Sequence, residues 1–527
     1  MVYNNIELTV SPEVAAIEAQ LKTVIAKTIE VDAESINGVR IIRQSIDARS
    51  RHEIKINLSV DVYTDDTMPD KIEYPFHYQD VSHATPVIVV GCGPAGLFGA
   101  LRLIELGLKP ILLERGKEVS ERKVDIAQIN RNNGINPESN YCFGEGGAGT
   151  FSDGKLFSRS KKRGNFMRIL LKFNQNGAAD EILYEAHPHI GTDKLPDIIK
   201  KMRETIVEHG GEVHFKTKVT ELIISDNRIK GVRTEEGNEY LSEAVILATG
   251  HSARDVYEML NRQGVELEQK GFAMGVRIEH PQEQIDQIQY HLKAMHKEDR
   301  GKYLPAASYS LVTQVEGRGV YSFCMCPGGF IVPAATFEKE TVVNGMSPSR
   351  RNSPFANSGI VVEIRPEDIE AHYKEEYGVL AGLKFQERYE KVAFQNGGGK
   401  AIAPAQRVSD FVRGKYTNDL PETSYVPGIV PSAMHFWLPE HIGKRLQSGI
   451  KEFDNKMHGF VTNEAIIVGV ESRTSSPVRI PRNPDTLEHI QIHGLYPSGE
   501  GAGYAGGITS SALDGEKCAE KIAEWLK

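Results

Sequence analysis

Three glycines near the start of the chain have the spacing of a dinucleotide-binding turn. Gly91, Gly93 and Gly96 form the pattern G-x-G-x-x-G after a short apolar run, 86–90, that is rich in β-branched residues. In such a turn the first glycine permits the tight bend, the second lets backbone approach a pyrophosphate, and the third lets a helix pack on a strand. The pattern predicts a buried strand, a turn, and a helix over 97–108 whose N-terminus faces a phosphate group.

An acidic residue follows where a dinucleotide's ribose is bound. A second apolar strand is expected at 110–113, and Glu114 ends it, 23 positions after Gly91. A carboxylate there accepts hydrogen bonds from ribose hydroxyls and disfavours a 2′-phosphate. The site should therefore hold FAD or NAD rather than NADP. We expect Pro94, Ala95 and Arg115 to complete the half of the site that binds ADP.

Two further stretches carry the same glycine pattern without the same context. They are 144–149 and 501–506, and neither lies between two predicted strands of which the second ends in an acid. Glycine backbone can press against a flat or charged ligand, so we interpret 143–155 as a second cofactor-contacting loop, with a flexible surface loop as the alternative. The later stretch opens a helix expected at 510–525, whose N-terminus suits an anion. The residues expected on the pyrophosphate, ribityl and pyrimidine side are Gly146, Gly147, Ala148, Gly149, Thr150, Gly499, Glu500, Gly507 and Ile508.

Another strand ends in small residues. Residues 244–248 are apolar and run into Thr249 and Gly250. A strand that reaches such a turn at the carboxyl edge of a parallel sheet belongs at a ligand crevice. Thr249, Gly250 and Val219, which precedes a meander expected at 220–240, complete the predicted cofactor set.

Two cysteines lie one residue apart. Cys324 and Cys326 are candidates for a redox pair, a charge-transfer thiolate or half of a metal site. Two thiols alone cannot close a zinc tetrahedron, and no histidine follows before His372, so we expect no metal. A disulfide across one residue is strained. The alternative is a pair of small residues that pack a strand beneath a Gly-Gly turn.

One arginine stands in a run of hydroxyl residues. Arg473 precedes Thr474, Ser475 and Ser476. Its planar guanidinium suits a bidentate anion, which would be a substrate carboxylate or the pyrimidine of a flavin. The alternative is a structural ion pair with Glu471 or Asp485. Arg473, Cys324 and Cys326 are the candidate catalytic residues.

Composition narrows the class of protein. The 527 residues suffice for two or three domains. A net charge of −9 argues against a dominant nucleic-acid surface, and no apolar run approaches the ~20 residues that span a bilayer. The polar N-terminus shows no signal peptide, and five cysteines do not make a disulfide framework. We expect a cytoplasmic protein without a membrane partner.

These motifs resemble a known class of flavoproteins. Gly91/Gly93/Gly96/Glu114, 248–250 and 499–508 are similar, in order, to the motifs of glutathione-reductase-like FAD proteins. More narrowly, 146–155, 187–193, 324–329 and 473–477 resemble the bacterial family of uncharacterised FAD-dependent, NAD(FAD)-utilising dehydrogenases, over nearly the whole chain. The resemblance implies FAD binding and oxidoreductase activity without naming a substrate. The chain lacks the C-x4-C pair and the second dinucleotide unit of pyridine-nucleotide disulfide reductases.

The predicted architecture is α/β. A Rossmann-like FAD-binding domain is discontinuous, with a first part at 84–260 and a C-terminal part at 489–527. An α+β cap or substrate domain is inserted at 261–488, and a small N-terminal α+β domain occupies 1–80.

The predicted function is an FAD-dependent oxidoreductase that transfers hydride through flavin N5 to or from a small-molecule substrate. NAD(P)H is a candidate electron donor, and the oligomeric state is left open. The alternative is a flavin-containing RNA-modifying or RNA-binding protein that uses the arginines of the hairpin at 38–63. That alternative is disfavoured because residues 1–80 hold more acidic than basic side chains.

Overall fold

The predicted turn at Gly91–Gly96 lies at the carboxyl edge of a five-stranded parallel sheet. The computed structural model describes residues 1–64, 68–69, 72–157 and 164–526. The strand order is β22-β10-β4-β5-β6 and every pairing is parallel. The strands are β4 (Pro86–Val90), β5 (Lys109–Leu113), β6 (Glu212–His214), β10 (Val245–Leu247) and β22 (Leu495–Pro497).

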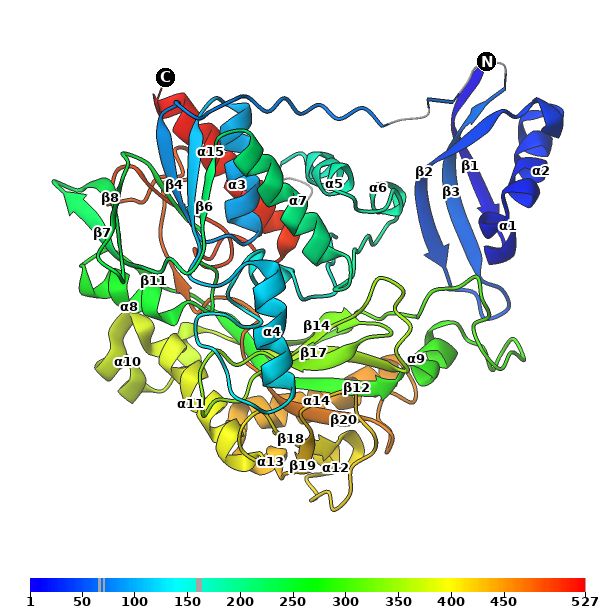
Figure 1. The fold of residues 1–527 in the computed structure, drawn as a ribbon. Coiled ribbons are helices and arrows are strands. Elements are labelled where there is room, and N and C mark those ends of the chain that lie inside the picture. The colour runs from blue at the N-terminus through cyan, green and yellow to red at the C-terminus, as the bar shows by residue number, and fades with distance from the viewer. Residues whose placement is uncertain (65–67, 70–71, 158–163, 527) are drawn as a thin grey trace.

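Both faces of this sheet are covered, which explains why its strands read as continuous apolar runs. Val87 and Val89 of β4 pack on one face against three helices, and Ile88 and Val90 pack on the other against a helix and a small sheet. The first face is covered by α3 (Pro94–Glu105), α7 (Leu195–Glu208) and α15 (Ile508–Leu526) (Figure 1). The second is covered by α8 (Arg254–Arg262) and the antiparallel sheet of β7 (Val219–Ser225), β8 (Arg228–Thr234) and β9 (Glu239–Leu241).

The first helix starts earlier than predicted. The prediction began it at Leu97, whereas α3 begins at Pro94 with Gly93 as its N-cap. Proline fits the first helical position because its missing N–H would be unpaired there in any case. The helix expected at 510–525 likewise extends over 508–526.

A seven-stranded sheet lies between β10 and β22 in the sequence. Its order is β13-β14-β17-β12-β20-β18-β19, and all pairings except β18–β19 are antiparallel. The strands are β12 (Phe272–Pro281), β13 (Val312–Val315), β14 (Arg318–Cys326), β17 (Phe355–Ile364), β18 (Ala403–Arg407), β19 (Ile429–Pro431) and β20 (Ile466–Glu471).

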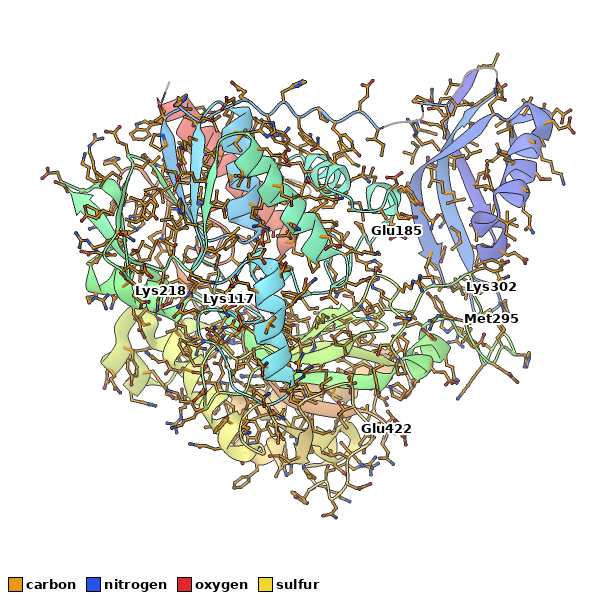
Figure 2. All side chains as sticks on the ribbon, in the orientation of Figure 1. Lys117, Glu185, Lys218, Met295, Lys302 and Glu422 are labelled. Atoms are coloured by element: carbon orange, nitrogen blue, oxygen red, sulfur yellow. The ribbon has the colours of Figure 1, made fainter. Side chains whose placement is uncertain are left out.

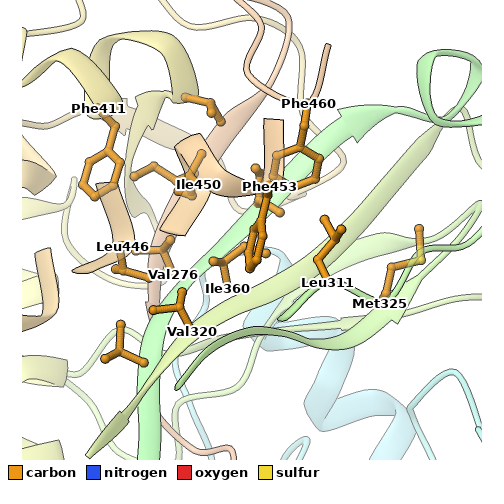
Figure 3. Close-up of a cluster of buried hydrophobic side chains, with 14 of the residues drawn as sticks. Val276, Leu311, Val320, Met325, Ile360, Phe411, Leu446, Ile450, Phe453 and Phe460 are labelled. Carbon is orange, nitrogen blue, oxygen red and sulfur yellow. The ribbon is translucent and has the colours of Figure 1, made fainter. Parts of the chain in front are cut away.

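The two faces of the seven-stranded sheet differ in polarity. Val276, Val320 and Ile360 face α14 (Glu440–Lys456), where Ile450 and Phe453 complete an apolar cluster (Figure 3). The opposite face carries Arg277, whose side chain contacts those of Cys326, Asn357 and Glu471. The alternation along β12 is the period of two that a strand imposes.

Other helices and strands surround these sheets. In the seven-stranded part they are α9 (Gln282–Gln289), α10 (Ala371–Tyr377), α11 (Ala381–Asn396), α12 (Val408–Arg413), α13 (Met434–Trp437) and the ribbon β15 (Phe330–Pro333)–β16 (Val343–Met346). Elsewhere lie α4 (Val119–Asn130), α5 (Phe166–Gln175), α6 (Glu181–Tyr184) and the pair β11 (Glu268–Gln269)–β21 (Val478–Arg479). Within the described ranges, no helix has the length and apolar character to cross a membrane.

A small unit at the N-terminus stands beside this body (Figure 1). Its antiparallel sheet, β1 (Val2–Val10), β3 (Lys55–Tyr63) and β2 (Gly38–Asp47), packs against α1 (Pro12–Ala16) and α2 (Glu18–Ile29). The sequence predicts one helix over 14–29, but Ile17 is extended and separates two helices. Glu185, just after α6, lies between α6 and β2 and pairs with Gln44 (Figure 2).

The α/β class with a Rossmann-like parallel sheet is confirmed. The sheet is built from strands on both sides of the seven-stranded segment in the sequence. The four predicted domain ranges stay predictions.

Candidate functional site

The turn after β4 is held by close backbone contacts. Gly91 has φ +104°, and a Cβ there would lie 2.4 Å from the carbonyl oxygen of Ala248. A Cβ at Gly96 would lie 1.9 Å from the carbonyl oxygen of Gly91, so no larger residue fits. At Gly93 a Cβ would meet nothing nearer than Gly147 Cα, at 3.8 Å. Gly91 and Gly96 therefore permit the turn, and the absence of a side chain at Gly93 leaves room beside it.

The N-terminus of α3 is suited to an anionic ligand. Gly93 caps the helix without a side-chain hydrogen bond, Pro94 follows, and Ala95 is buried in the first turn. The first N–H groups of a helix have no partner within the helix and carry its positive dipole end. This end of α3 therefore fits a pyrophosphate.

Glu114 lies where the sequence predicts the ribose contact, and it has a second role. Its carboxylate is buried and accepts hydrogen bonds from the backbone N–H groups of Cys92 (2.9 Å), Gly116 (2.9 Å) and Gly144 (3.0 Å). Glu114 thus ties three loops together. A carboxylate has about four acceptor sites, so one remains for a ribose hydroxyl.

Arg115 is anchored beside this carboxylate. It pairs with Glu138 (2.6 Å) and Asp255 (2.8 Å), which raise the pKa of its guanidinium although burial acts against them, and its Cζ lies 4.3 Å from the centre of the Phe143 ring. Its Nη2 is buried and has no hydrogen-bond partner among the residues that the structure describes. Val219 at the start of β7 packs in the same apolar cluster as Phe143. The unpartnered Nη2 fits a polar group of a bound nucleotide.

The second glycine-rich loop packs against the first turn. Gly146 has φ +79°, and a Cβ there would collide with Thr150 Oγ1. The backbone N–H of Gly146 donates to the carbonyl oxygen of Cys92 (2.7 Å), and a Cβ on Gly147 would lie 3.0 Å from Gly93 Cα. Ala148 is exposed at the top of the single turn Gly147–Gly149. The loop therefore packs against the first turn.

The C-terminal loop closes the same site. A Cβ at Gly149 would lie 3.4 Å from Pro94 and 3.3 Å from Ile508, so the starts of α3 and α15 meet at this loop. Apart from the adjacent residues, no heavy atom of the described chain lies within 4 Å of a Cβ built at Gly250, Gly506 or Gly507. Thr249 and Gly250 follow β10 at the same edge of the sheet. These backbones border open space.

Glu500 and His251, which belong to the loops that contain Gly506 and Gly250, have shifted pKa values. Burial raises the pKa of Glu500 to about 7, with Lys270 acting against it. Burial lowers the pKa of His251 to about 4, and its Nε2 donates to the carbonyl oxygen of Arg473 (2.8 Å). His251 is therefore neutral at physiological pH. It follows Gly250 directly, a position that the sequence analysis did not single out.

Arg473 forms ion pairs with two carboxylates that differ from the expected partners. The alternative pairing with Glu471 or Asp485 is wrong: Arg473 Nη2 lies 2.8 Å from Glu390 and 3.2 Å from Glu340. Nη1 donates to Thr336 Oγ1 (2.9 Å). Burial opposes the charge of Arg473, but the two carboxylates raise the pKa of its guanidinium. Its role as a substrate-binding catalytic residue stays a prediction.

A second arginine completes this buried cluster. Arg254 of α8 pairs with Glu390 (2.8 Å) and Glu340 (3.5 Å). Burial raises the pKa of Glu340, whereas Arg254 and Arg473 hold the pKa of Glu390 low against its burial. Sequence spacing could not reveal these partners, because they come from four separate segments.

Cys324 and Cys326 end β14 on the polar face of the seven-stranded sheet. Cys326 is buried, and its Sγ lies 3.6 Å from both Lys155 Nζ and Arg277 Nη2. Cys324 is exposed as a residue, yet desolvation raises the pKa of its thiol to about 12. Arg277 was not singled out from the sequence. The alternation along β12, where Arg277 lies between Val276 and Ile278, is the signal that could have found it.

Comparison with known proteins identifies the family. A protein of Clostridium beijerinckii named "Uncharacterized protein" is 42% identical over 543 residues, which cover 99% of this chain and 98% of the relative. The family described as FAD dependent oxidoreductase matches residues 196–341, and the one described as FAD-dependent protein, C-terminal domain-like, matches 271–474. This chain belongs to the FAD-dependent oxidoreductases.

Further matches to this oxidoreductase are more distant. Residues 2–63 match a domain of unknown function. Thiamine thiazole synthase of Aeropyrum pernix is 26% identical over 200 residues, 35% of this chain and 62% of that protein. The solved L-proline dehydrogenase from P. horikoshii has 13% identity and a TM-score of 0.32 over 84% of this chain and 94% of that one, too low to support an argument. The alternative of an RNA-modifying or RNA-binding protein receives no support.

Proposed function

We propose that FAD lies along the carboxyl edge of the parallel sheet, in the manner of the glutathione-reductase-like class. Its pyrophosphate would meet the N-terminus of α3, its adenosine ribose Glu114, and its flavin ring the N-terminus of α15. The observation that carries this proposal is the meeting of Pro94, Gly149 and Ile508 within contact distance. Three separate loops thereby border one space.

The bound FAD supplies two-electron chemistry at flavin N5, and this chain supplies binding and electrostatics. The open backbone at Gly506 and Gly507 precedes α15, whose positive end would stabilise an anionic reduced ring. Substrate would bind between this edge and the polar face of the seven-stranded sheet. Arg473, Cys324 and Cys326 remain the catalytic candidates there, and 84–260 with 489–527 the proposed FAD-binding domain.

A nicotinamide is the proposed electron donor. No second dinucleotide unit of the kind that begins at β4 is apparent in the sequence, so NADH or NADPH would have to reach the flavin from the substrate side. The cytoplasmic location also stays a prediction.

A visible spectrum of the native protein tests the electron donor. NADH and then NADPH are added anaerobically, and we expect the flavin band near ~450 nm to bleach with one of them. A band that stays oxidised with both would overturn the nicotinamide proposal and leave the electrons to come from another substrate.

A pair of glycine variants tests where FAD binds. Gly250 and Gly264 share a φ of +72°, and neither Cβ would meet a heavy atom of the described chain within 4 Å. Gly250→Ala and Gly264→Ala therefore carry similar backbone strain. We expect Gly250→Ala to weaken FAD binding at least tenfold and Gly264→Ala to leave it unchanged. Equal affinities in the two variants would argue against FAD at Gly250.

A further inference from the structure

β14 carries a bulge where its two cysteines lie. Phe323 pairs with Gly359 of β17 and Cys326 with Asn357, so β14 holds one residue more than its partner between these points. Cys324, in this interval, has φ +45°, which is uncommon for a residue other than glycine. Bulges re-aim side chains and occur next to active sites.

The bulge decides which face each side chain occupies. Side chains alternate along a strand, so the extra residue reverses the alternation beyond Phe323. Met325 thereby enters the apolar cluster beneath α14 (Figure 3), and Cys326 joins Arg277 on the polar face. In an unbulged strand Met325 would face Arg277, and Cys326 would face the apolar core.

Charge is unbalanced around the Cys326 sulfur. Arg277 pairs with Glu471 (3.0 Å), while Asp153 is shared between Arg351 (2.7 Å) and Lys155 (3.6 Å). Three cations thus meet two carboxylates, and the two cations nearest the sulfur each lie 3.6 Å from it. A pair of small packing residues would require neither cation.

A reactive thiol needs neighbouring cations and exposure to its substrate, and each of the two cysteines has one of these properties. Reactive cysteines are partly exposed and lie beside Lys or Arg. Cys326 has the cations, and its Sγ turns back to within 3.2 Å of the carbonyl oxygen of Cys324. Cys324 has the exposure; desolvation raises the pKa of its thiol, and the positive charges of Lys155 and Arg277 act against that rise. Together the two residues provide both.

Lys155 connects this pair to the proposed flavin position. Its neighbour Leu156 accepts a hydrogen bond from Thr509 Oγ1 in the first turn of α15 (2.8 Å). The backbone beside Lys155 is thus bonded to the start of α15, while the Lys155 ammonium reaches the Cys326 sulfur. This link rests on the proposed function, because it assumes the flavin at α15.

We propose that Cys324 and Cys326 are a redox-active dithiol and that the substrate class is a disulfide. The exposed Cys324 sulfur forms a mixed disulfide with the substrate, and the first product thiol leaves with the Cys324 proton. Cys326 displaces the second product thiol, which takes the Cys326 proton, and the Cys324–Cys326 bond closes. Two electrons and two protons delivered by way of the reduced flavin regenerate the dithiol. One substrate disulfide becomes two thiols in each cycle.

Peptide mass spectrometry with oxidised glutathione as the probe tests this proposal. FAD-loaded protein is incubated anaerobically with the probe, freed from it, and alkylated either directly or after flavin reduction with dithionite. We expect Cys324 and Cys326 to resist alkylation before flavin reduction and both to be alkylated after it. In Cys326→Ser a glutathione adduct should persist on Cys324. Cys142→Ser, which removes a thiol outside the pair, should behave like the unaltered protein.

The outcomes separate this proposal from the proposed function. If both cysteines are alkylated after the glutathione step while the flavin band is normal, the dithiol is overturned and the FAD site stands. A protein that binds no FAD yet forms the Cys324–Cys326 bond would overturn the proposed flavin position instead.

Lys155 supplies a further readout. Lys155→Gln should slow alkylation of Cys326 in the reduced protein about tenfold, and Lys155→Arg should restore the rate. Equal rates in all three proteins would contradict the role given to this cation.

Discussion

In the parallel sheet, the turns after β4, β10 and β22 border the candidate cofactor site with backbone atoms, and Glu114 and Arg115 add side chains after β5. In the seven-stranded sheet, the polar groups are side chains such as Arg277 and Cys326 on one face. The first arrangement depends on glycines, which have no side chain to fill the space. The second depends on side-chain partners that are far apart in the sequence. A single added carbon should therefore disrupt the first region, whereas a single lost charge should disrupt the second.

The largest effect is expected at Gly96. In Gly96→Ala the new Cβ would lie 1.9 Å from the carbonyl oxygen of Gly91, so β4 and α3 must move apart. We expect loss of FAD binding and a loss of stability of at least ~3 kcal/mol. Thermal unfolding and FAD absorbance check this.

Gly506→Ala is the matched control. No heavy atom of the described chain lies within 4 Å of its Cβ, so the fold should be unaffected. If Gly96→Ala kept both its FAD and its unfolding temperature, the turn after β4 would not depend on close backbone packing at Gly96.

Loss of one carboxylate should produce the largest effect in the buried charge cluster. Glu390→Gln leaves Arg254 and Arg473 with Glu340 as their shared carboxylate. Breaking such a buried pair costs about 3 to 5 kcal/mol. Urea unfolding measures this loss.

Glu387→Gln, on the same helix, provides the comparison for that loss. Glu387 pairs with Lys384 and Lys391 near the surface, so its replacement should cost less than about 1 kcal/mol. Similar losses in the two variants would remove the distinction between buried and surface charges here.

A smaller effect is expected where a side chain supports the backbone of the first region. Asp514 accepts the backbone N–H of Gly499 (2.8 Å) and pairs with Arg482 (2.6 Å). In Asp514→Asn the turn before α15 loses a charged acceptor, and the dissociation constant of FAD should rise about tenfold, or ~1.4 kcal/mol. Asp485→Asn, at an exposed position, should leave the constant unchanged; FAD titration separates the two.

An effect of a different kind, a pH dependence of stability, is expected from Glu500. Its pKa is raised to about 7 from 4.5, so the folded protein binds more protons than the unfolded chain between these values. Stability of the FAD-free protein should therefore fall as pH rises through this window, by about 1 to 3 kcal/mol. Glu500→Gln should flatten this slope. An unchanged slope, measured by urea unfolding at several pH values, would assign it to another group.

The same contrast explains how much could be predicted from the sequence. The strand, turn and helix around Gly91–Gly96 were predicted because a turn depends on neighbouring residues. The first helix of the parallel sheet begins at Pro94 instead of Leu97, and Ile17 divides a helix that was predicted to be continuous. Capping and local backbone conformation decide both details. The ribose contact of Glu114 stays a prediction, and the three backbone donors to its carboxylate were not predicted.

The side-chain partners in the second region could not be predicted. Glu471, one alternative partner for Arg473, pairs with Arg277 instead, and Arg473 pairs with Glu390. These partners are set by strand register and helix packing across 83 residues of sequence in one pair and 194 in the other. Spacing along the chain carries no information about such contacts.

The order in which the parallel sheet is completed has a consequence for synthesis of the protein. β22 pairs with β10 and α15 packs against α3, where a Cβ at Gly515 would lie 1.9 Å from the carbonyl oxygen of Ala95. One wall of the proposed cofactor site is therefore translated after the whole seven-stranded segment. A nascent chain on the ribosome cannot capture FAD in a finished site until α15 has emerged. Cofactor loading therefore reports that translation has passed α15, and a chain truncated before β22 should emerge without flavin.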